Sequence, residues 1–250
     1  MTVASVINYG EDPLQTIKFF HFDKNNKHTL IFIHGGAWRD PNNTYDDFKE
    51  LINQLPTDNT NYIGLNYRLS PEVKHPSHLV DVVHAISFLE KEHGIHNASL
   101  VGHSVGATLI LQLLMYQTLL GQSLDINPPT IKLDSLFFID GIYDIADLVD
   151  EYPDYISFVN EAFASEDDYV EAVPLAGKFR RTPFELEFKK AHILQSLEDE
   201  LLSERQSDIF ASFLQEKEVP FTDSRGNWGK HEEVYRRKEI AEIICSDLSN

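Results

Sequence analysis

The sequence Gly-His-Ser-Val-Gly at residues 102–106 is the feature that most restricts how this chain can fold. It lies between a short, mostly apolar run at residues 99–101 and a longer apolar run at residues 107–116. A strand that stops at a serine between two glycines and continues as a helix is typical of a nucleophile elbow, a tight turn that lifts the serine hydroxyl above a sheet. Ser104 is therefore the candidate nucleophile.

Apolar runs and amphipathic segments alternate along most of the chain. The candidate strands are residues 15–22, 29–33, 62–67, 99–103, 133–139 and 191–195. The candidate helices are residues 46–54, 77–92, the segment after Ser104, 204–216 and 235–244. This alternation predicts an α/β fold with a mainly parallel sheet, helices on both faces, and a site at the carboxyl ends of the strands.

Residues 145–187 interrupt the alternation with short acidic and aromatic pieces that contain Pro153, Pro174 and Pro183. We expect this segment to form a small helical excursion over the edge of the sheet. A length of 250 residues suits one sizeable domain and is short for two. The sequence therefore predicts a single domain over residues 1–250 that includes the excursion.

Charge and cysteine usage restrict the partners and the compartment. With 21 basic and 40 acidic side chains, the net charge of −19 repels phosphate backbones and anionic membranes, so we expect neither as a partner. The single cysteine, Cys245, cannot form an internal disulfide, and we expect a packed thiol. Residues 1–5 lack an export signal, and no run reaches the ~18 apolar residues of a membrane span. We expect a cytoplasmic protein, and a homodimer remains open.

A serine nucleophile needs a histidine base, and only His192 and His231 follow Ser104 in the chain. His192 falls inside a predicted strand, so its side chain should face a helix layer and serve the structure. His231 follows Gly-Asn-Trp-Gly-Lys at residues 226–230, a loop permissive enough to bring an imidazole across the strand ends. We therefore expect His231 to be the base.

The acid that orients the base should also follow the nucleophile in the chain. Asp199 comes shortly after the predicted strand 191–195 and precedes a new helix, which places it in a loop at the carboxyl end of that strand. A carboxylate there can bind the imidazole and hold its tautomer. Asp199 is the favoured acid, and the competing carboxylates are Asp140, Glu198 and Asp208.

The oxyanion of an acyl-transfer intermediate needs fixed hydrogen-bond donors. Gly35 and Gly36 follow the predicted strand 29–33, and glycines allow backbone N–H groups to approach a ligand closely. The N–H of Val105, directly after the nucleophile, would supply a further donor. These three residues are the predicted oxyanion hole, and we expect His34 to brace the loop.

Three motifs carry a family resemblance. They are His-Gly-Gly-Ala-Trp at residues 34–38, Asn-Tyr-Arg-Leu-Ser-Pro-Glu at residues 66–72 and the elbow at residues 102–106. Together they resemble the esterase and lipase branch of the α/β-hydrolase fold. The His-Gly-Gly-x-Trp form is similar to that of kynurenine formamidases, and residues 33–44 resemble the fungal members.

This resemblance implies hydrolysis of N-formyl-L-kynurenine to L-kynurenine and formate in tryptophan degradation, through a formyl-enzyme intermediate and without cofactor or metal. It assigns Ser104, Asp199 and His231 as the triad. Trp38, beside the oxyanion loop, is a candidate wall for the aromatic ring of the substrate, although ordinary core packing explains it equally well. Two competing functions stay open: a carboxylesterase for small acyl or aryl esters, and a binding protein on an inactive hydrolase scaffold.

Overall fold

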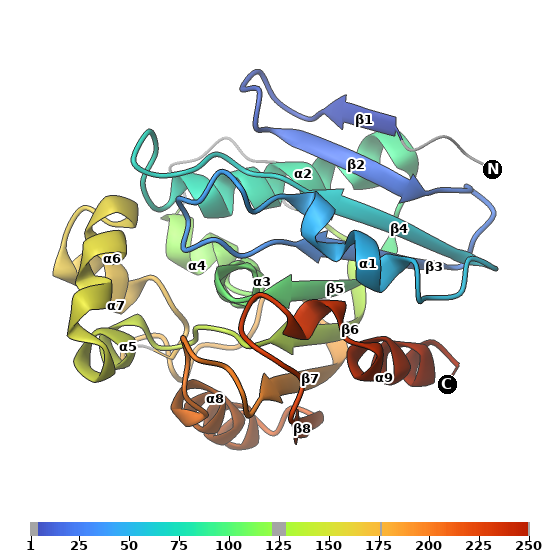
Figure 1. Cartoon of the computed structure of the whole chain (residues 1–250). Coiled ribbons are helices and arrows are strands. Elements are labelled where there is room, and N and C mark those ends of the chain that lie inside the picture. The colour runs from blue at the N-terminus through green and yellow to red at the C-terminus, as the bar shows by residue number, and fades with distance from the viewer. Residues whose placement is uncertain (1–4, 122–128, 176, 250) are drawn as a thin grey trace.

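The structure is a computed structural model that describes residues 5–121, 129–175 and 177–249. Its centre is an eight-stranded sheet with the strand order β1-β2-β4-β3-β5-β6-β7-β8 (Figure 1). The pairs β1·β2 and β2·β4 are antiparallel, and every later pair is parallel. The predicted α/β fold with a mainly parallel sheet is confirmed. Residues 1–4, where an export signal would begin, lie outside the described ranges.

All six predicted strands are present, and two further strands lie at the edges of the sheet. The strands are β1 Ser5–Asn8, β2 Thr16–His21, β3 His28–Ile33, β4 Thr60–Leu65, β5 Asn97–His103, β6 Lys132–Ile139, β7 Phe188–Ser196 and β8 Phe221–Gly226. The unpredicted strands β1 and β8 are the outermost ones; β1 is largely exposed, and β8 is partly exposed. They lack a long apolar run because an edge strand buries little of its surface.

The predicted helices are present with changes at their ends. The α-helices are α1 Lys49–Ile52, α2 Ser77–His93, α3 Val105–Leu113, α4 Tyr116–Leu120, α5 Ile145–Glu151, α6 Ile156–Ala162, α7 Glu166–Glu171, α8 Arg205–Glu216 and α9 Lys238–Leu248. The short 3₁₀ turns of the described ranges are η1 Tyr45–Phe48, η3 Pro153–Tyr155 and η4 Val234–Arg236. The helix predicted at 235–244 is divided because Arg237, between η4 and α9, has an extended backbone.

Helices cover both faces of the sheet. Alternate residues of β3 face opposite sides, as the pleat of a strand requires. Ile31 and Ile33 pack in a core with α2, α3 and α8, whereas Leu30 and Phe32 pack in a second core with α1 and α9. Cys245, partly buried, packs against the second core, as expected for a structural thiol. Within the described residues, no helix is long and apolar enough to cross a membrane.

The excursion between β6 and β7 forms the helices α5, α6 and α7, so its predicted helical character is confirmed over residues 145–171. Its described residues between 172 and 187, which exclude residue 176, form turns and irregular structure. These helices contribute to a third core with Trp38, Val105 and Ile142, which follow the carboxyl ends of β3, β5 and β6. The excursion therefore lies beside the strand ends, where it can wall a site, and not over a side edge of the sheet.

Candidate active site

Ser104 occupies the turn between β5 and α3. Its backbone has φ 53° and ψ −122°, a conformation that L-residues with side chains rarely adopt. The Ser104 N–H donates to the carbonyl of Ile139 at 2.9 Å, which ties the turn to the end of β6. A strained turn held by its neighbours is the geometry expected of a nucleophile elbow.

The two glycines of the elbow are required by close backbone contacts. A Cβ on Gly106 would lie 2.1 Å from the carbonyl oxygen of Ile33, at the end of β3. A Cβ on Gly102 would lie 2.6 Å from the backbone of Gly106. Only residues without a side chain let β5, α3 and the end of β3 approach this closely. The glycines of the motif therefore set the position of Ser104 above the strand ends.

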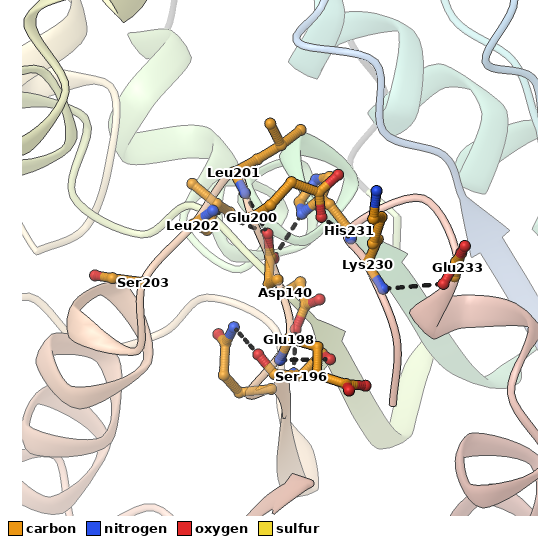
Figure 2. A network of polar contacts seen from close by, with 12 residues as sticks. Asp140, Ser196, Glu198, Glu200, Leu201, Leu202, Ser203, Lys230, His231 and Glu233 are labelled. Atoms are coloured by element: carbon orange, nitrogen blue, oxygen red, sulfur yellow. Dashed lines mark hydrogen bonds and ion pairs between the residues drawn. The ribbon is translucent and has the colours of Figure 1, made fainter. Parts of the chain in front are cut away.

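His231 and Asp199 form a buried hydrogen-bonded pair. The imidazole Nδ1 of His231 lies 2.7 Å from the Asp199 Oδ2 atom. The other oxygen of Asp199 accepts the N–H groups of Leu201 at 2.8 Å and Leu202 at 2.9 Å (Figure 2). Although burial opposes ionisation, the hydrogen bonds from His231, Leu202 and Leu201 lower the pKa of Asp199. A charged acid is thus held against the imidazole.

Two glutamates hold the loop that carries His231. Glu200 accepts the backbone N–H of His231 at 3.0 Å, and Glu198 accepts the N–H of Gly229 at 2.8 Å. The hydroxyl of Ser196 donates to the carbonyl of Gly229 at 2.5 Å. No sequence pattern marks these anchors, because their partners are 31 to 33 residues away along the chain. The contacts join the loops after β7 and β8 into one connected unit.

Ser104 and His231 line the same cavity of about 270 Å³. Its apolar wall consists of Ile142, Tyr155, Phe158, Leu201 and Leu202. Its remaining lining residues are Gly36, Ala37, Arg39, Asp40, Asn43 and Glu232. The cavity brings together the end of β3, the elbow, the excursion and the loops after β7 and β8, so segments far apart in sequence share one site.

Arg39 is the only lysine or arginine among the described residues that line this cavity. Its guanidinium donates to Glu161 at 2.9 Å and lies 5.8 Å from the ring centroid of Phe158. The side chain remains 38% exposed. A guanidinium has five N–H donors, so one ion pair leaves others free for a ligand. A cation is thereby held at the aromatic wall.

The loop after β3 has an unusual backbone. Gly36, Ala37 and Trp38 have φ values of 94°, 49° and 60°, and the Gly36 carbonyl accepts the N–H groups of the two residues after Trp38. Gly36 and Ala37 line the cavity. Gly35 is not a lining residue; a Cβ on it would lie 3.1 Å from the Cβ of Ser104. Gly35 therefore lets the loop approach the elbow, and Ala37 is a cavity residue that the sequence motifs did not single out.

Val105 begins α3, so its N–H is one of the first helical donors and has no partner within the helix. Its side chain is fully buried in the core shared with the excursion. The backbone of Val105 follows Ser104 directly, which is compatible with the predicted donor role.

The sequence does carry one indication that Ala37 could line the site, since Ala37 directly follows the second glycine of the loop.

Trp38 is only 1% exposed and does not line the cavity. Its ring centroid lies 6.1 Å from that of Phe158 and 5.3 Å from that of Phe163. Trp38 is therefore a core residue. The positive φ values of the loop turn its indole toward the excursion. Trp38 supports Phe158, which is itself part of the cavity wall.

The other predicted histidines have structural surroundings. His192 stacks on Phe137 with ring centroids 4.5 Å apart and contacts Thr222 and Asp247. His34 stacks on Tyr67, and its Nδ1 lies 2.9 Å from the carbonyl of Gly35. Burial lowers the pKa of His34 to about 4, so it is neutral. Both contact patterns agree with the expected structural roles.

The competing carboxylates are distributed around the pair. Asp208 is exposed and pairs with Arg225, and Glu198 holds the His231 loop. Asp140 is fully buried, and its Oδ1 accepts the N–H of Ser196 at 2.7 Å. Among the three, Asp140 alone approaches the His231–Asp199 pair: one ligand atom from each of Asp140, Asp199 and His231 lies within 4.8 Å of the others.

Solved structures with a similar fold include esterases. Esterase B from Lactobacillus rhamnosis has a TM-score of 0.73 over 98% of this chain and 83% of its own, at 17% identity. Esterase LipW from Mycobacterium marinum has a TM-score of 0.74 over 99% of this chain and 82% of its own, at 14% identity. Such low identities concern the fold alone. Together with the elbow, they show that this chain has the α/β-hydrolase fold.

Sequence comparison is more specific. The family described as BD-FAE matches residues 19–152. The kynurenine formamidase of Meyerozyma guilliermondii is 50% identical over 99% of this chain and 95% of its own length. The kynurenine formamidase of Saccharomyces cerevisiae is 33% identical over 94% of each chain. The chain belongs to the kynurenine formamidase family, which confirms the resemblance carried by its motifs.

Proposed function

We propose that this protein hydrolyses N-formyl-L-kynurenine to L-kynurenine and formate, with Ser104, His231 and Asp199 as its catalytic triad. The observation that carries the proposal is the 2.7 Å contact between His231 and Asp199, together with the cavity that Ser104 and His231 share. The 50% identity to a relative named kynurenine formamidase supports the substrate. No cofactor or metal enters the proposed reaction.

The proposed reaction has two halves. His231 accepts the proton of Ser104 while the serine oxygen attacks the formyl carbon, and Asp199 stabilises the imidazolium that forms. His231 then gives this proton to the departing aryl amine, which breaks the C–N bond and leaves a formyl-enzyme ester. Water, deprotonated by His231, attacks the ester and releases formate. The leaving nitrogen is weakly basic, because its lone pair is shared with the ring.

Backbone donors of the glycine loop and of the elbow would hold the oxyanion. Gly36 faces the cavity and Val105 offers a helix-terminal N–H, which supports both as donors. Ala37 joins them as a third candidate because it also lines the cavity. We assign Gly35 the role of letting the loop lie against Ser104, because a Cβ there would crowd the side chains of His103 and Ser104 and force them to shift.

The lining of the cavity suits the parts of this substrate. The apolar wall offers a surface for the aromatic ring, while Trp38 supports that wall from behind. Arg39 can bind the α-carboxylate with its free N–H groups, and Asp40 and Glu232 can bind the α-ammonium group. An uncharged aryl ester would use only the apolar wall. This arrangement favours formylkynurenine hydrolysis over a carboxylesterase activity.

We propose that residues 1–250 act as one domain, since the excursion contributes Tyr155 and Phe158 to the same cavity as the elbow. A cytoplasmic location remains a prediction from the sequence, and the homodimer remains open.

The test is formate release from purified protein and N-formyl-L-kynurenine, compared with hydrolysis of phenyl acetate by the same preparation. We expect kcat/KM for the formamide to exceed that for the ester. The reverse order would favour the carboxylesterase, and turnover of neither substrate would favour the inactive scaffold.

A further inference from the structure

A second carboxyl group lies behind the triad acid. Asp140 directly follows β6, is fully buried and has φ 40°, a backbone region that Asp and Asn tolerate better than other side chains. Its Oδ1 accepts the N–H of Ser196 at 2.7 Å, which fixes the carboxyl plane. In Figure 2, Asp140 lies between the turn at Ser196 and the imidazole of His231.

The other oxygen of Asp140, Oδ2, is buried and has no hydrogen-bond partner among the described residues. A buried carboxylate oxygen without a donor is costly, whereas a carboxylic acid O–H at the same place needs only a nearby acceptor. Asp199 offers such an acceptor: one oxygen of each carboxyl group lies within 4.8 Å of the other, and a hydrogen bond between the two side chains contributes to the raised pKa of Asp140. The geometry therefore suits one neutral and one charged acid.

The charges around Asp140 point the same way. Asp199 and Glu200 face Asp140 from the loop after β7, and His231 faces it from the loop after β8. The hydroxyl of Tyr143 interacts with Asp140 from the same segment of chain, between β6 and α5. Burial, with the negative charges of Asp199 and Glu200, raises the pKa of Asp140 to about 9. The pKa of Asp199 is lowered. Environments that separate two carboxyl groups in this way assign them different roles.

We propose that Asp140 is a positioning residue: a carboxylic acid that stays neutral at pH 7, whose O–H points at Asp199 and keeps Asp199 the only charged acid behind His231. Its proton stays on Asp140 throughout the reaction, so no bond to substrate is made or broken there. The activity readout rests on the proposed hydrolase function, whereas the stability readout below does not. Asp140 would thus offer one hydrogen-bond acceptor and one donor, as the side-chain amide of an asparagine does.

The mimicry can be tested with Asp140→Asn and Asp140→Leu. An asparagine can accept from Ser196 with its oxygen and donate toward Asp199 with its nitrogen, and it tolerates the backbone conformation. We expect D140N to keep kcat/KM at pH 7 within about twofold of the wild type. Leucine has a similar shape but no donor, and we expect D140L to lose on the order of tenfold in kcat with KM little changed. A D140N loss as large as that of D199N overturns the proposal.

Thermal unfolding gives a second readout that needs no substrate. Because the pKa of Asp140 is raised on folding, the native state holds an extra proton between about pH 4 and pH 9. The contribution of Asp140 to wild-type stability must therefore fall as the pH rises through that window, and D140N lacks this contribution. We expect the Tm of D140N minus that of the wild type to grow by several degrees from pH 5 to pH 9 and then to level off.

The matched control is Asp208→Asn, which removes an exposed carboxylate from the same acidic chain. Its Tm difference from the wild type should stay nearly constant over the same pH range, because the surroundings of an exposed carboxylate differ little between the folded and unfolded chain. A flat difference for D140N, equal to that of D208N, would show that Asp140 is charged in the native protein and would overturn the proposal.

Discussion

Two histidines of the described residues lie within hydrogen-bond distance of an aspartate, and only one of these His–Asp pairs meets a nucleophile at a cavity. At the carboxyl ends of the strands, His231 Nδ1 lies 2.7 Å from Asp199. In the other pair, on β7, His192 Nε2 lies 3.2 Å from Asp247 while its Nδ1 contacts the hydroxyl of Thr222 at 2.8 Å. The second set thus has an acid, a base and a hydroxyl in contact, as a catalytic triad does.

The difference between the two pairs lies in their surroundings. Thr222 sits in the edge strand β8 with an ordinary extended backbone, whereas Ser104 sits in a strained turn at a cavity. Asp247 also pairs with Lys190 at 2.5 Å, so its charge is shared with a cation. A parallel sheet places ligand sites at the carboxyl ends of its strands. Contacts among Asp, His and a hydroxyl therefore do not make a site without that position.

The largest expected effect that separates the two sets comes from their hydroxyls. Ser104→Ala should lower kcat for N-formyl-L-kynurenine by roughly 10⁴-fold or more, since no oxygen remains to attack the formyl carbon. Steady-state formate release measures this, and an unchanged Tm would show that the fold is intact. Thr222→Ala is the control and should leave kcat unchanged. Near-normal turnover by S104A would move the nucleophile elsewhere.

Next in size is the effect of the acids. Asp199→Asn should cost about 10³–10⁴-fold in kcat, because an amide nitrogen facing Nδ1 favours the wrong imidazole tautomer. Asp247→Asn, the same change in the other pair, should leave kcat within about twofold. Both variants can be assayed with the formamide over pH 6–9. Equal losses in the two variants would contradict the assignment of His231 as the base.

A smaller effect is expected at the cation of the cavity. Arg39→Met should lower kcat/KM for N-formyl-L-kynurenine by roughly 10–100-fold, because the α-carboxylate loses a charged partner. Formanilide, which keeps the reacting bond but lacks the amino-acid head, should be hydrolysed equally by both proteins. The matched variant Arg205→Met changes an exposed ion pair outside the cavity, and its ratio of kcat/KM for the two substrates should equal that of the wild type. Equal losses on both substrates would remove the carboxylate-binding role.

The smallest effect is expected at the His192–Asp247 pair, where a substitution should change only the stability of the fold. Although burial opposes ionisation, His192, Lys190 and Ser135 lower the pKa of Asp247 well below its usual range. A lowered pKa stabilises the folded state above the unfolded value near pH 4, and this contribution is lost as the pH falls. Asp247→Asn should therefore lower Tm by a few degrees at pH 7 and by less at pH 3. A deficit that is independent of pH would contradict this.

The contrast between the pairs also shows how far sequence reasoning reaches. The sequence predicts a structural role for His192 because it lies inside an apolar run, and it favours His231 because that histidine follows a glycine-containing loop. The structure places the two in those settings. The sequence favours Asp199 over Asp140 from its place after a strand, although both acids lie close to the imidazole. Position along the chain could not reveal that Asp140 turns its second oxygen into a buried space.

Other residues are not recognisable in the sequence because their surroundings are assembled from distant segments. Trp38 adjoins the oxyanion loop in sequence, yet it packs against Phe158 and Phe163 of the excursion. Arg39 and Tyr155 carry no pattern that marks a ligand contact, and they become cavity residues only when the excursion meets the glycine loop. The edge strands β1 and β8 lack the apolar runs by which the inner strands are recognised.

The sequence by itself determined the alternation of strands and helices, the elbow motif around Ser104, the chain order of the candidate acid and base, and the family. These features are local or follow chain order, because hydrophobic period and glycine placement act over a few residues. Only the tertiary structure decided which carboxyl groups lie near His231, the opposite directions in which the pKa values of Asp140 and Asp199 shift, and which side chains wall the cavity. Burial and nearby charge set these properties, and both depend on residues that meet only when the chain is folded.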